Sequence, residues 1–361
     1  METKIKFGLV GCGRISNKHI EAIAGYFKDA ELMCVCDIVG EKAEKKVLEY
    51  TDFLLKKGIK KEDIHEPKVY TNLDRMLDEQ KIDIISLCTP SGLHPLHAIK
   101  AAARGVHVLS EKPMGTSLKQ ADEMIRACDE AEVRLFVVKQ NRLNDTIKLL
   151  RRTIDKGRFG RIYMILENVL WTRSQSYYDE AKWRGKWEFD GGAFMNQASH
   201  YVDLMEWLGG PVESVTSITT TLARKIETED TGSAIVKFRN GAIGNINVTM
   251  LTYPKNLEGS ITIIGEKGTV KIGGVALNKI EKWEFDTEDE DDRLAESVNY
   301  DPPNIYGFGH LGYYKNVIDV LKNEAEPNTD GREGRKSLEL ILGIYKSSRE
   351  GKTIGLPLDL Y

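Results

Sequence analysis

Short apolar stretches alternate with helix-like stretches over the first 140 residues, and this alternation leaves few possible folds. Strands are expected at 4–10, 31–38, 68–70, 83–88, 106–110 and 133–138, with helices at 15–28, 40–50, 72–79, 94–104 and 117–130. Strands that are apolar throughout and separated by helices are typical of a parallel sheet covered on both faces. Residues 1–141 are therefore predicted to form an α/β domain with a doubly wound parallel sheet.

The pattern changes after residue 141. Alternating stretches suited to strands lie at 161–171, 212–224, 232–239, 242–251, 260–264 and 268–272, and turns such as Asn240-Gly241 suit hairpins. We expect a second α/β domain over 142–361, built on one large, mostly antiparallel open sheet. Two late helices, at 308–323 and 332–349, are candidates to pack on the first domain. The acidic run 284–292 is interpreted as a solvated loop.

Composition limits the class of protein. The 361 residues suggest two domains, and 41% hydrophobic with 29% charged residues is ordinary for a globular chain. A net charge of −4 gives no reason to expect a nucleic acid or membrane partner, and no apolar run reaches about 18 residues. Five cysteines without a C-x-x-C pair indicate reduced thiols, a cytoplasmic location and no metal site.

The sharpest local motif is GCGRIS at 11–16, which follows the first strand and opens the first helix. In that context Gly11 permits a tight turn and Gly13 lets the backbone approach a pyrophosphate at the helix N-terminus. Asp37 ends the second strand, close to where a carboxylate that binds a ribose 2′-hydroxyl is expected. No basic residue follows it directly, which favours NAD over NADP. The alternative is that Asp37 merely caps the next helix.

Two further segments follow strands of the first domain, 88–94 (CTPSGLH) and 110–115 (SEKPMG). Ligands of open α/β sheets bind at the carboxyl ends of strands. Lys112 precedes Pro113, which disfavours a helical conformation and favours presentation from a strand end, although a lone lysine is more often a solvated surface residue. Within these motifs the candidate cofactor-binding residues are Gly11, Cys12, Gly13, Arg14, Ile15, Asp37, Thr89, Pro90, Leu93, His94, Glu111 and Lys112.

The informative stretch of the second half is 188–208. A helix is expected after Gly191-Gly192, with Asp190 as a possible cap. Asn196, His200 and Asp203 are spaced i, i+4 and i+7, so they form one polar stripe on an apolar helix. Such a stripe either faces solvent or lines a site, and an imidazole can exchange protons near neutral pH.

These motifs together resemble the glucose–fructose oxidoreductase / inositol dehydrogenase / rhizopine-catabolism (Gfo/Idh/MocA) family of NAD(P)-dependent oxidoreductases. GCGRIS, CTPSGLH, SEKPMG, VVKQNR (137–142) and GG-x7-His-x-x-Asp (191–203) occur in the family's order along essentially the whole chain. The resemblance implies a Rossmann domain followed by an α/β domain whose open sheet makes oligomer contacts, hence a homodimer or homotetramer. Within the family, segments 173–178, 183–187 and 191–197 resemble the UDP-N-acetylglucosaminuronate 3-dehydrogenases.

The same resemblance assigns roles to individual residues. It implies that Lys112 and His200 are catalytic and flank the carbon that gives up hydride. Some members have Asp where this chain has Asn196, which puts a full Lys–Asp–His relay in doubt. It further implies that substrate contacts come from Lys112, Arg173, Tyr178, Asn196 and His200, and additional cofactor contacts from Gln140, Trp183 and Arg184.

The expected function is therefore NAD-dependent oxidation of a secondary alcohol, at C3 of UDP-N-acetylglucosaminuronic acid in polysaccharide precursor biosynthesis. His200, with its ordinary pKa near 6.5, is the expected base, and Lys112 is expected to polarise the same oxygen, although the two roles are interchangeable on sequence grounds. Two alternatives stay open at this point. One is a dehydrogenase of a free polyol or sugar such as inositol, and the other is a non-catalytic NAD(H)-binding regulatory protein.

Overall fold

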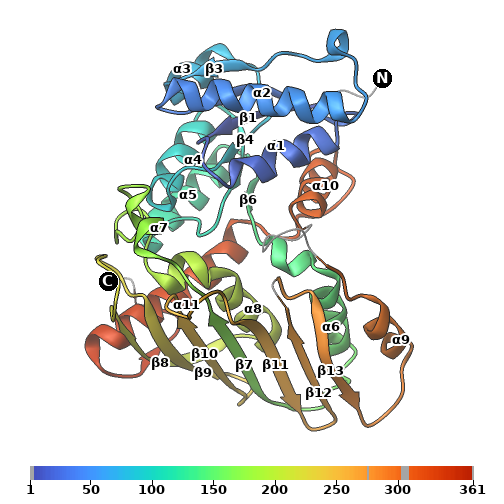
Figure 1. The fold of residues 1–361 in the computed structure, drawn as a ribbon, viewed down its shortest axis with the longest axis vertical. Helices are drawn as coiled ribbons and strands as arrows, with labels where there is room; N and C mark the ends of the chain where they lie inside the picture. Colours follow the sequence, from blue (N-terminus) through green and yellow to red (C-terminus); the bar gives the residue numbers. More distant parts are fainter. Residues whose placement is uncertain (1–3, 275, 302–308, 360–361) are drawn as a thin grey trace. The chain divides into compact units, whose positions relative to one another are not determined.

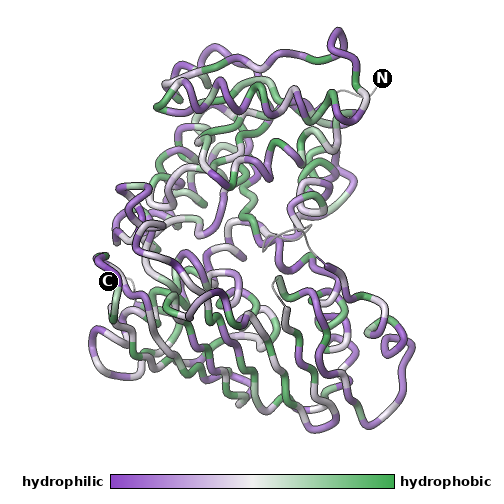
Figure 2. The backbone as a smooth tube through the Cα atoms, in the orientation of Figure 1, coloured by the Kyte–Doolittle hydropathy of each residue, from purple (hydrophilic) through white to green (hydrophobic). Residues whose placement is uncertain are grey.

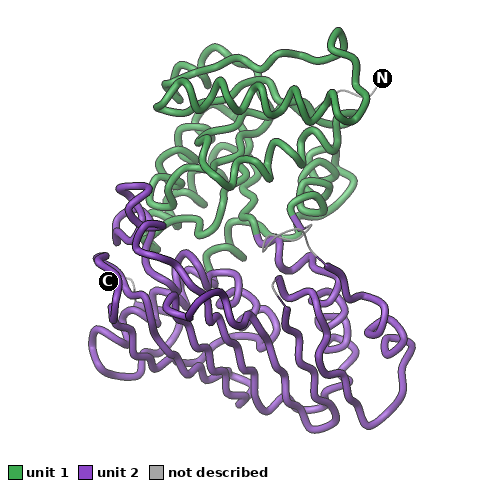
Figure 3. Tube along the Cα trace, viewed as in Figure 1, with its two compact units in different colours: residues 1–138, 310–335 green, residues 139–309, 336–361 purple. Residues whose placement is uncertain are grey.

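A computed structural model describes residues 4–274, 276–301 and 309–359. Figure 1 shows the ribbon, and Figure 3 shows its division into two compact units. Unit 1 comprises residues 1–138 and 310–335, and unit 2 comprises residues 139–309 and 336–361. The chain therefore returns to unit 1 late in the sequence, and each unit is described below by itself.

Unit 1 contains a six-stranded sheet with the order β3-β2-β1-β4-β5-β6, and all of its pairings are parallel. The inner strands are mostly apolar and buried, and β4 is buried at all four positions, whereas the edge strand β3 is exposed at Lys68 and Val69. The prediction of a doubly wound parallel sheet is confirmed. Its elements are β1 (Ile5–Val10), α1 (Ser16–Gly25), β2 (Ala30–Cys36), α2 (Gly40–Lys56), β3 (Lys68–Tyr70), α3 (Leu73–Glu79), β4 (Ile84–Leu87), α4 (His94–Ala102), β5 (His107–Ser110), α5 (Leu118–Glu130), β6 (Leu135–Val137) and α10 (Gly309–Leu321).

The sheet has its topological switch point between β1 and β4, where successive strands begin to be added on the other side of β1. From β1 the chain continues to β2 and β3 on one side, whereas β4, β5 and β6 extend the sheet on the other side. The loops that leave β1 and β4 therefore diverge at the carboxyl ends of these neighbouring strands, which is where open α/β sheets bind ligands. Figure 2 shows the contrast in hydropathy between these mostly hydrophobic strands and the largely hydrophilic helix α2.

Unit 2 contains an eight-stranded sheet with the order β13-β12-β11-β7-β10-β9-β8-β14. All neighbours are antiparallel except β7 and β10, which run parallel, so the predicted mostly antiparallel sheet is confirmed. Its elements are α6 (Asp145–Asp155), β7 (Ile162–Leu170), α7 (Gln175–Asp179), α8 (Ser199–Gly209), β8 (Val212–Thr220), β9 (Thr231–Phe238), β10 (Ile243–Thr249), β11 (Glu258–Gly265), β12 (Gly268–Gly273), β13 (Lys279–Phe285), α9 (Glu290–Ser297), α11 (Gly331–Glu350) and β14 (Ile354–Gly355).

The two faces of this second sheet differ. Alternate residues of its strands, such as Ile165, Val169 and Ile246, are almost fully buried, and α8 packs against β7 and β10 on that side. The opposite face exposes Ile218, Ile235 and other side chains. The buried face therefore forms the core of unit 2 and carries the helix on which His200 lies.

The acidic segment 284–292 differs from its expected form as a solvated loop. It ends β13 and then starts α9, where Asp289 forms a capping box with Asp292. Carboxylates are favoured at a helix N-terminus, and here they also meet basic side chains of α6. Asp291 is fully buried and pairs with Arg152 and with Lys156. Most acids of the segment are exposed as expected, but the prediction of a loop was wrong, as was solvation of Asp291, because its partners come from far earlier in the chain.

No helix in the described ranges is both long and apolar enough to cross a membrane.

Candidate active site

The glycine-rich turn after β1 is shaped by close backbone contact. Gly11 has a φ of +90°, and a Cβ there would lie 2.7 Å from the carbonyl carbon of Cys88 and from the nitrogen of Thr89. Only glycine fits such a position. A Cβ on Gly13, by contrast, would meet nothing within 4 Å. Gly13 therefore leaves open space in front of α1, whose N-terminus has no side-chain cap, as binding of a pyrophosphate there requires.

Asp37 joins this turn to the end of β2. Its Oδ2 accepts a hydrogen bond from the backbone N–H of Cys12 at 2.7 Å, and its Oδ1 accepts one from Val39 at 2.9 Å. The carboxylate is half-buried, whereas the next residue, Ile38, is 90% exposed. Asp37 is thus fixed beside the turn, and burial raises the pKa of the neighbouring Cys12 thiol to about 12.

His94 connects the two loops predicted to carry cofactor contacts. Its Nε2 lies 2.8 Å from the carbonyl oxygen of Thr89, and its Nδ1 lies 2.9 Å from that of Pro113. The side chain of His94 is 1% exposed, and it links the two loops through these backbone contacts. Around it, Leu93 and Pro90 are half-buried in the short turn that precedes α4.

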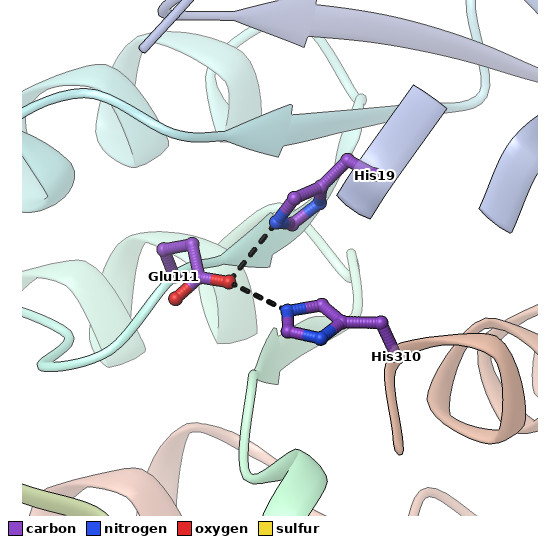
Figure 4. Close-up of side chains that lie close together, drawn as sticks. All are labelled: His19, Glu111 and His310. Carbon is purple, nitrogen blue, oxygen red and sulfur yellow. Dashed lines mark hydrogen bonds and ion pairs between the residues drawn. The ribbon is translucent and has the colours of Figure 1, made fainter. Parts of the chain in front are cut away.

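Glu111 is the centre of a buried polar cluster in unit 1 (Figure 4). Its Oε1 lies 3.0 Å from Nε2 of His19 and 3.3 Å from Nε2 of His310, and its Oε2 accepts the backbone N–H of Lys112 at 3.1 Å. Burial opposes ionisation of Glu111, but the hydrogen bonds from the two histidines hold its pKa well below its usual range. Both imidazoles face one oxygen at hydrogen-bonding distance, so hydrogen bonds suffice to explain this geometry.

The cluster continues away from Glu111. Nδ1 of His19 lies 2.7 Å from the hydroxyl of Tyr314, which in turn lies 2.7 Å from that of Ser86. The cluster thus links α1, β4 and α10 to the residue before Lys112. Lys112 itself is half-buried and follows β5 by two residues.

The predicted helix around His200 is two elements in the structure. Residues Ala193–Gln197 form a π-helical turn, and α8 begins only at Ser199. Asp190 does not cap this turn, contrary to expectation. Its Oδ2 accepts the backbone N–H of Gly185 at 2.7 Å, and its Oδ1 accepts the amide of Asn196. Asn196 thus lies on the π-helical turn, whereas His200 and Asp203 lie on α8.

Two side chains distant in sequence hold the π-helical turn. Oε1 of Glu229 accepts the backbone N–H of Phe194 at 2.8 Å and the hydroxyl of Tyr345 at 2.9 Å. The Tyr345 oxygen also accepts the N–H of Gly192 at 3.2 Å and that of Met195 at 3.1 Å. Sequence reasoning missed Glu229 and Tyr345, since an isolated acid or tyrosine gives no signal of such a contact.

His200 is contacted by a residue from the first segment of unit 2. The side-chain amide nitrogen of Gln140 lies 2.9 Å from its Nε2. One turn along α8, the carboxylate of Asp203 accepts two hydrogen bonds of 2.8 Å from Arg142, and Nζ of Lys139 lies 3.3 Å away. Burial opposes ionisation of Asp203, but Lys139 and Arg142 outweigh it and lower the carboxyl pKa. The structure thus brings together Gln140 and His200.

Aromatic and basic side chains alternate along 171–187. The guanidinium of Arg173 lies 5.3 Å from the ring of Trp171 and 5.5 Å from that of Tyr177, and Arg184 lies 4.2 Å from Tyr177. Such contacts hold the guanidinium groups over aromatic faces. Trp183 is half-buried beside Arg184, at 5.7 Å, whereas Tyr178 is only 7% exposed.

The predicted residues thus form separate groups in the two units. Unit 1 contains the glycine turn with Asp37 and Thr89, and the loop of Lys112. Unit 2 contains His200 with Gln140, Asn196 on the π-helical turn, and the segment of Arg173. Arg14 is exposed and Ile15 half-buried at the start of α1. A glycine turn at the switch point, with a carboxylate after β2, is typical of a dinucleotide-binding Rossmann fold.

Comparison with known proteins specifies the class. Residues 5–139 match the model of the oxidoreductase family's NAD-binding Rossmann fold, and residues 151–356 match that of its C-terminal alpha/beta domain. The chain belongs to the Gfo/Idh/MocA oxidoreductase family and is an NAD-dependent enzyme.

Relatives cover nearly the whole chain. Myo-inositol 2-dehydrogenase of Thermotoga maritima is 24% identical over 98% of both chains. The WlbA dehydrogenase of Bordetella pertussis, solved in complex with NADH and UDP-GlcNAcA, is 55% identical over 99% of both chains with a TM-score of 0.93. WlbA of Chromobacterium violaceum, solved with the same two ligands, is 52% identical over 99% of this chain and 98% of its own, with a TM-score of 0.91.

Proposed function

We propose that this enzyme oxidises C3 of UDP-N-acetylglucosaminuronic acid, with NAD as hydride acceptor, in the biosynthesis of a polysaccharide precursor. The observation that carries the proposal is the 55% identity, over 99% of both chains, to a dehydrogenase solved with NADH and UDP-GlcNAcA. The relative at 24% identity acts on myo-inositol, so it supports the family's chemistry more than this substrate.

The glycine turn of unit 1 fits NAD. In the proposal, the space before Gly13 and the uncapped start of α1 receive the pyrophosphate, and Asp37 binds a ribose hydroxyl. NAD, when bound, supplies the nicotinamide carbon that accepts hydride. The remaining cofactor candidates, on the loops after β4 and β5 and at Gln140, Trp183 and Arg184, stay predictions.

Removal of the substrate's hydroxyl proton is assigned to residues of the chain itself. We assign His200 as the base that removes the hydroxyl proton of the substrate, since imidazole is the side chain that ordinarily exchanges protons near neutral pH. Lys112 donates a hydrogen bond to the same oxygen and stabilises the charge that develops on it. Asn196 is positioned by Asp190 and is assigned to the substrate rather than to proton transfer.

The substrate is a polyanion, with a carboxylate and a diphosphate, and the chain offers cations to match. Arg173 and Arg184 are held over aromatic rings and can donate paired hydrogen bonds to carboxylate or phosphate oxygens. We assign Arg173 to the substrate together with Tyr178, which is 7% exposed.

The test uses purified enzyme, NAD and three substrates: UDP-N-acetylglucosaminuronic acid, UDP-N-acetylglucosamine and myo-inositol. NADH absorbance reports turnover, and mass spectrometry identifies the product. We expect a kcat/KM at least 10²-fold higher for the uronate than for UDP-N-acetylglucosamine, because the neutral sugar lacks the carboxylate that accepts charge-assisted hydrogen bonds from the arginines. Preferred oxidation of myo-inositol would replace the proposal with the polyol alternative.

We further propose a cytoplasmic homodimer or homotetramer. All five cysteines are buried and unpaired with one another, as suits a reducing compartment. Exposed isoleucines on the open face of the unit 2 sheet support self-association.

A further inference from the structure

Gln140 is a buried side chain directed at the proposed base. It begins the short helical turn Gln140–Leu143 in unit 2 and is 2% exposed. Its amide nitrogen lies 2.9 Å from Nε2 of His200, and within the described ranges its own carbonyl oxygen is buried without a hydrogen-bond partner. The side chain is therefore committed to one contact, the imidazole.

Buried ion pairs fix the segment that carries Gln140 against the helix that carries His200. Lys139 and Arg142, on either side of Gln140, both bind Asp203, which lies three residues after His200 on α8. Nζ of Lys139 is also 2.5 Å from the hydroxyl of Ser337, so its place is fixed from a second direction. The segment 139–142 and α8 are thus clamped by buried ion pairs that flank the amide–imidazole contact.

The charged groups around the imidazole come from three elements. Asp203 and Glu206 lie on α8 itself, and Lys139 and Arg142 come from the segment before α6. Glu167 lies on β7 beneath the helix, where burial raises its pKa well above the ordinary value and keeps it neutral. Asp203 is matched by two cations, and the amide of Gln140 is a direct polar contact of Nε2.

An amide side chain can serve both protonation states of an imidazole. Its N–H donates to Nε2 when that nitrogen is unprotonated, and its C=O accepts from Nε2–H after a half-turn of the amide group. We propose that Gln140 is a positioning residue whose amide N–H holds Nε2 of His200 as the unprotonated ring nitrogen, so that Nε2 is the atom that takes the substrate proton. The inference rests on the proposed function, in which His200 is the base.

The proton step follows from this assignment. The O–H bond of the alcohol breaks and its proton bonds to Nε2, while the C–H electron pair leaves as hydride to NAD. The resulting imidazolium keeps its Nδ1–H, and its new Nε2–H donates to the carbonyl oxygen of Gln140 after the amide turns. That oxygen gains the partner it otherwise lacks, so the contact is stronger in the charged state than in the neutral one.

The decisive variant is Gln140→Glu, which supplies a permanent acceptor of similar shape. A carboxylate beside the imidazole favours its charged form, so we expect the pKa of His200 to rise by about one unit or more. Ring ¹⁵N NMR of the NAD-bound enzyme measures it, with His200→Asn to identify the signal. Gln120→Glu, on the exposed side of α5, is the matched control and should leave His200 unchanged.

A second variant keeps the test decisive if Gln140→Glu does not fold. Gln140→Leu removes the acceptor, so the pKa of His200 should fall and kcat should drop about tenfold, with KM for the sugar nucleotide nearly unchanged. An unaltered titration of His200 in both variants would overturn the inference. The NMR readout needs no turnover. If His200→Asn kept full activity while the titration still moved in Gln140→Glu, the proposed function of His200 would fail and the contact would stand.

Discussion

Lys112 and His200 are the two residues whose loss should stop the chemistry and leave the fold intact. Both side chains are half-buried; Lys112 follows β5 by two residues, and His200 lies in the first turn of α8. A positioned acid or base typically accelerates a reaction by about 10²–10⁴-fold. We therefore expect Lys112→Ala and His200→Asn each to lower kcat by roughly that factor. Quenching of protein fluorescence by NADH should show unchanged cofactor affinity.

The control for these variants is Lys119→Ala, which removes an exposed lysine from α5. It should retain wild-type kcat. Wild-type turnover by both site variants would rule out the assignment, whereas loss of NADH binding would show that the cofactor site had been damaged instead.

Cofactor choice is also decided at the scale of single residues. Asp37 is fixed by Cys12 and Val39, and Ile38 next to it is almost fully exposed. Replacing Asp37→Ser together with Ile38→Arg removes a carboxylate that repels a 2′-phosphate and adds a cation that binds it. The ratio of kcat/KM for NAD to that for NADP should fall by about 10²-fold or more in steady-state assays. Ile38→Arg alone retains the carboxylate and should keep the preference for NAD; an unchanged ratio in the double variant would contradict the role of Asp37.

At the scale of elements, the sequence predicted those structures that depend on local pattern. The parallel strands of unit 1 are apolar runs, and β3 has the predicted bounds 68–70. The π-helical turn before α8 was not predictable, because Glu229 and Tyr345 satisfy its backbone N–H groups from positions remote in the sequence. Helix α9 was missed for the same reason, because Arg152 and Lys156, the partners of its acidic Asp291, are remote in the sequence.

The π-helical turn should make stability depend on pH through Glu229. Burial raises the pKa of this carboxyl to about 7, so the folded protein holds a proton that the unfolded chain loses near pH 4.5. Its contribution is complete below about pH 4.5 and is lost as the pH rises to about 7, with a slope of up to roughly 1.4 kcal/mol per pH unit. Glu229→Gln should reduce this fall in the free energy of unfolding, measured with urea at about pH 5 and about pH 7.5.

The neighbouring Glu227→Gln is the control for this titration. Glu227 is exposed and pairs with Lys186, so its replacement should leave the slope between these pH values in place. An identical slope in Glu229→Gln and the wild type would mean that Glu229 does not carry the proton.

For the whole molecule, the sequence predicted those features that depend on short motifs and on their order along the chain. The family, the two kinds of sheet and the cofactor follow from turns and strand ends that are contiguous in sequence. The roles within the site depend instead on contacts between separate segments. Gln140 was assigned to the cofactor by its motif, and only the folded chain reveals that its amide meets His200. Local pattern identified the chemistry, and tertiary contacts determine which group is held ready for it.

The assembly of the molecule can be tested on the open face of the unit 2 sheet. Ile218, Ile235 and Ile243 are exposed by 75%, 55% and 43%. Paired residues, and residues two apart on a strand, share a face of the sheet. Ile235 pairs with Thr216 and Asn245, and Ile243 pairs with Lys237, so the three isoleucines lie on one face. Clustered apolar side chains on an open sheet favour a second copy of the chain as cover. Ile235→Asp buries a charge in such an interface and should shift the enzyme to a smaller species in size-exclusion chromatography with light scattering. Leu48→Asp, a similarly exposed apolar site on α2, should leave the mass unchanged, and an unshifted mass for Ile235→Asp would place the oligomer interface elsewhere.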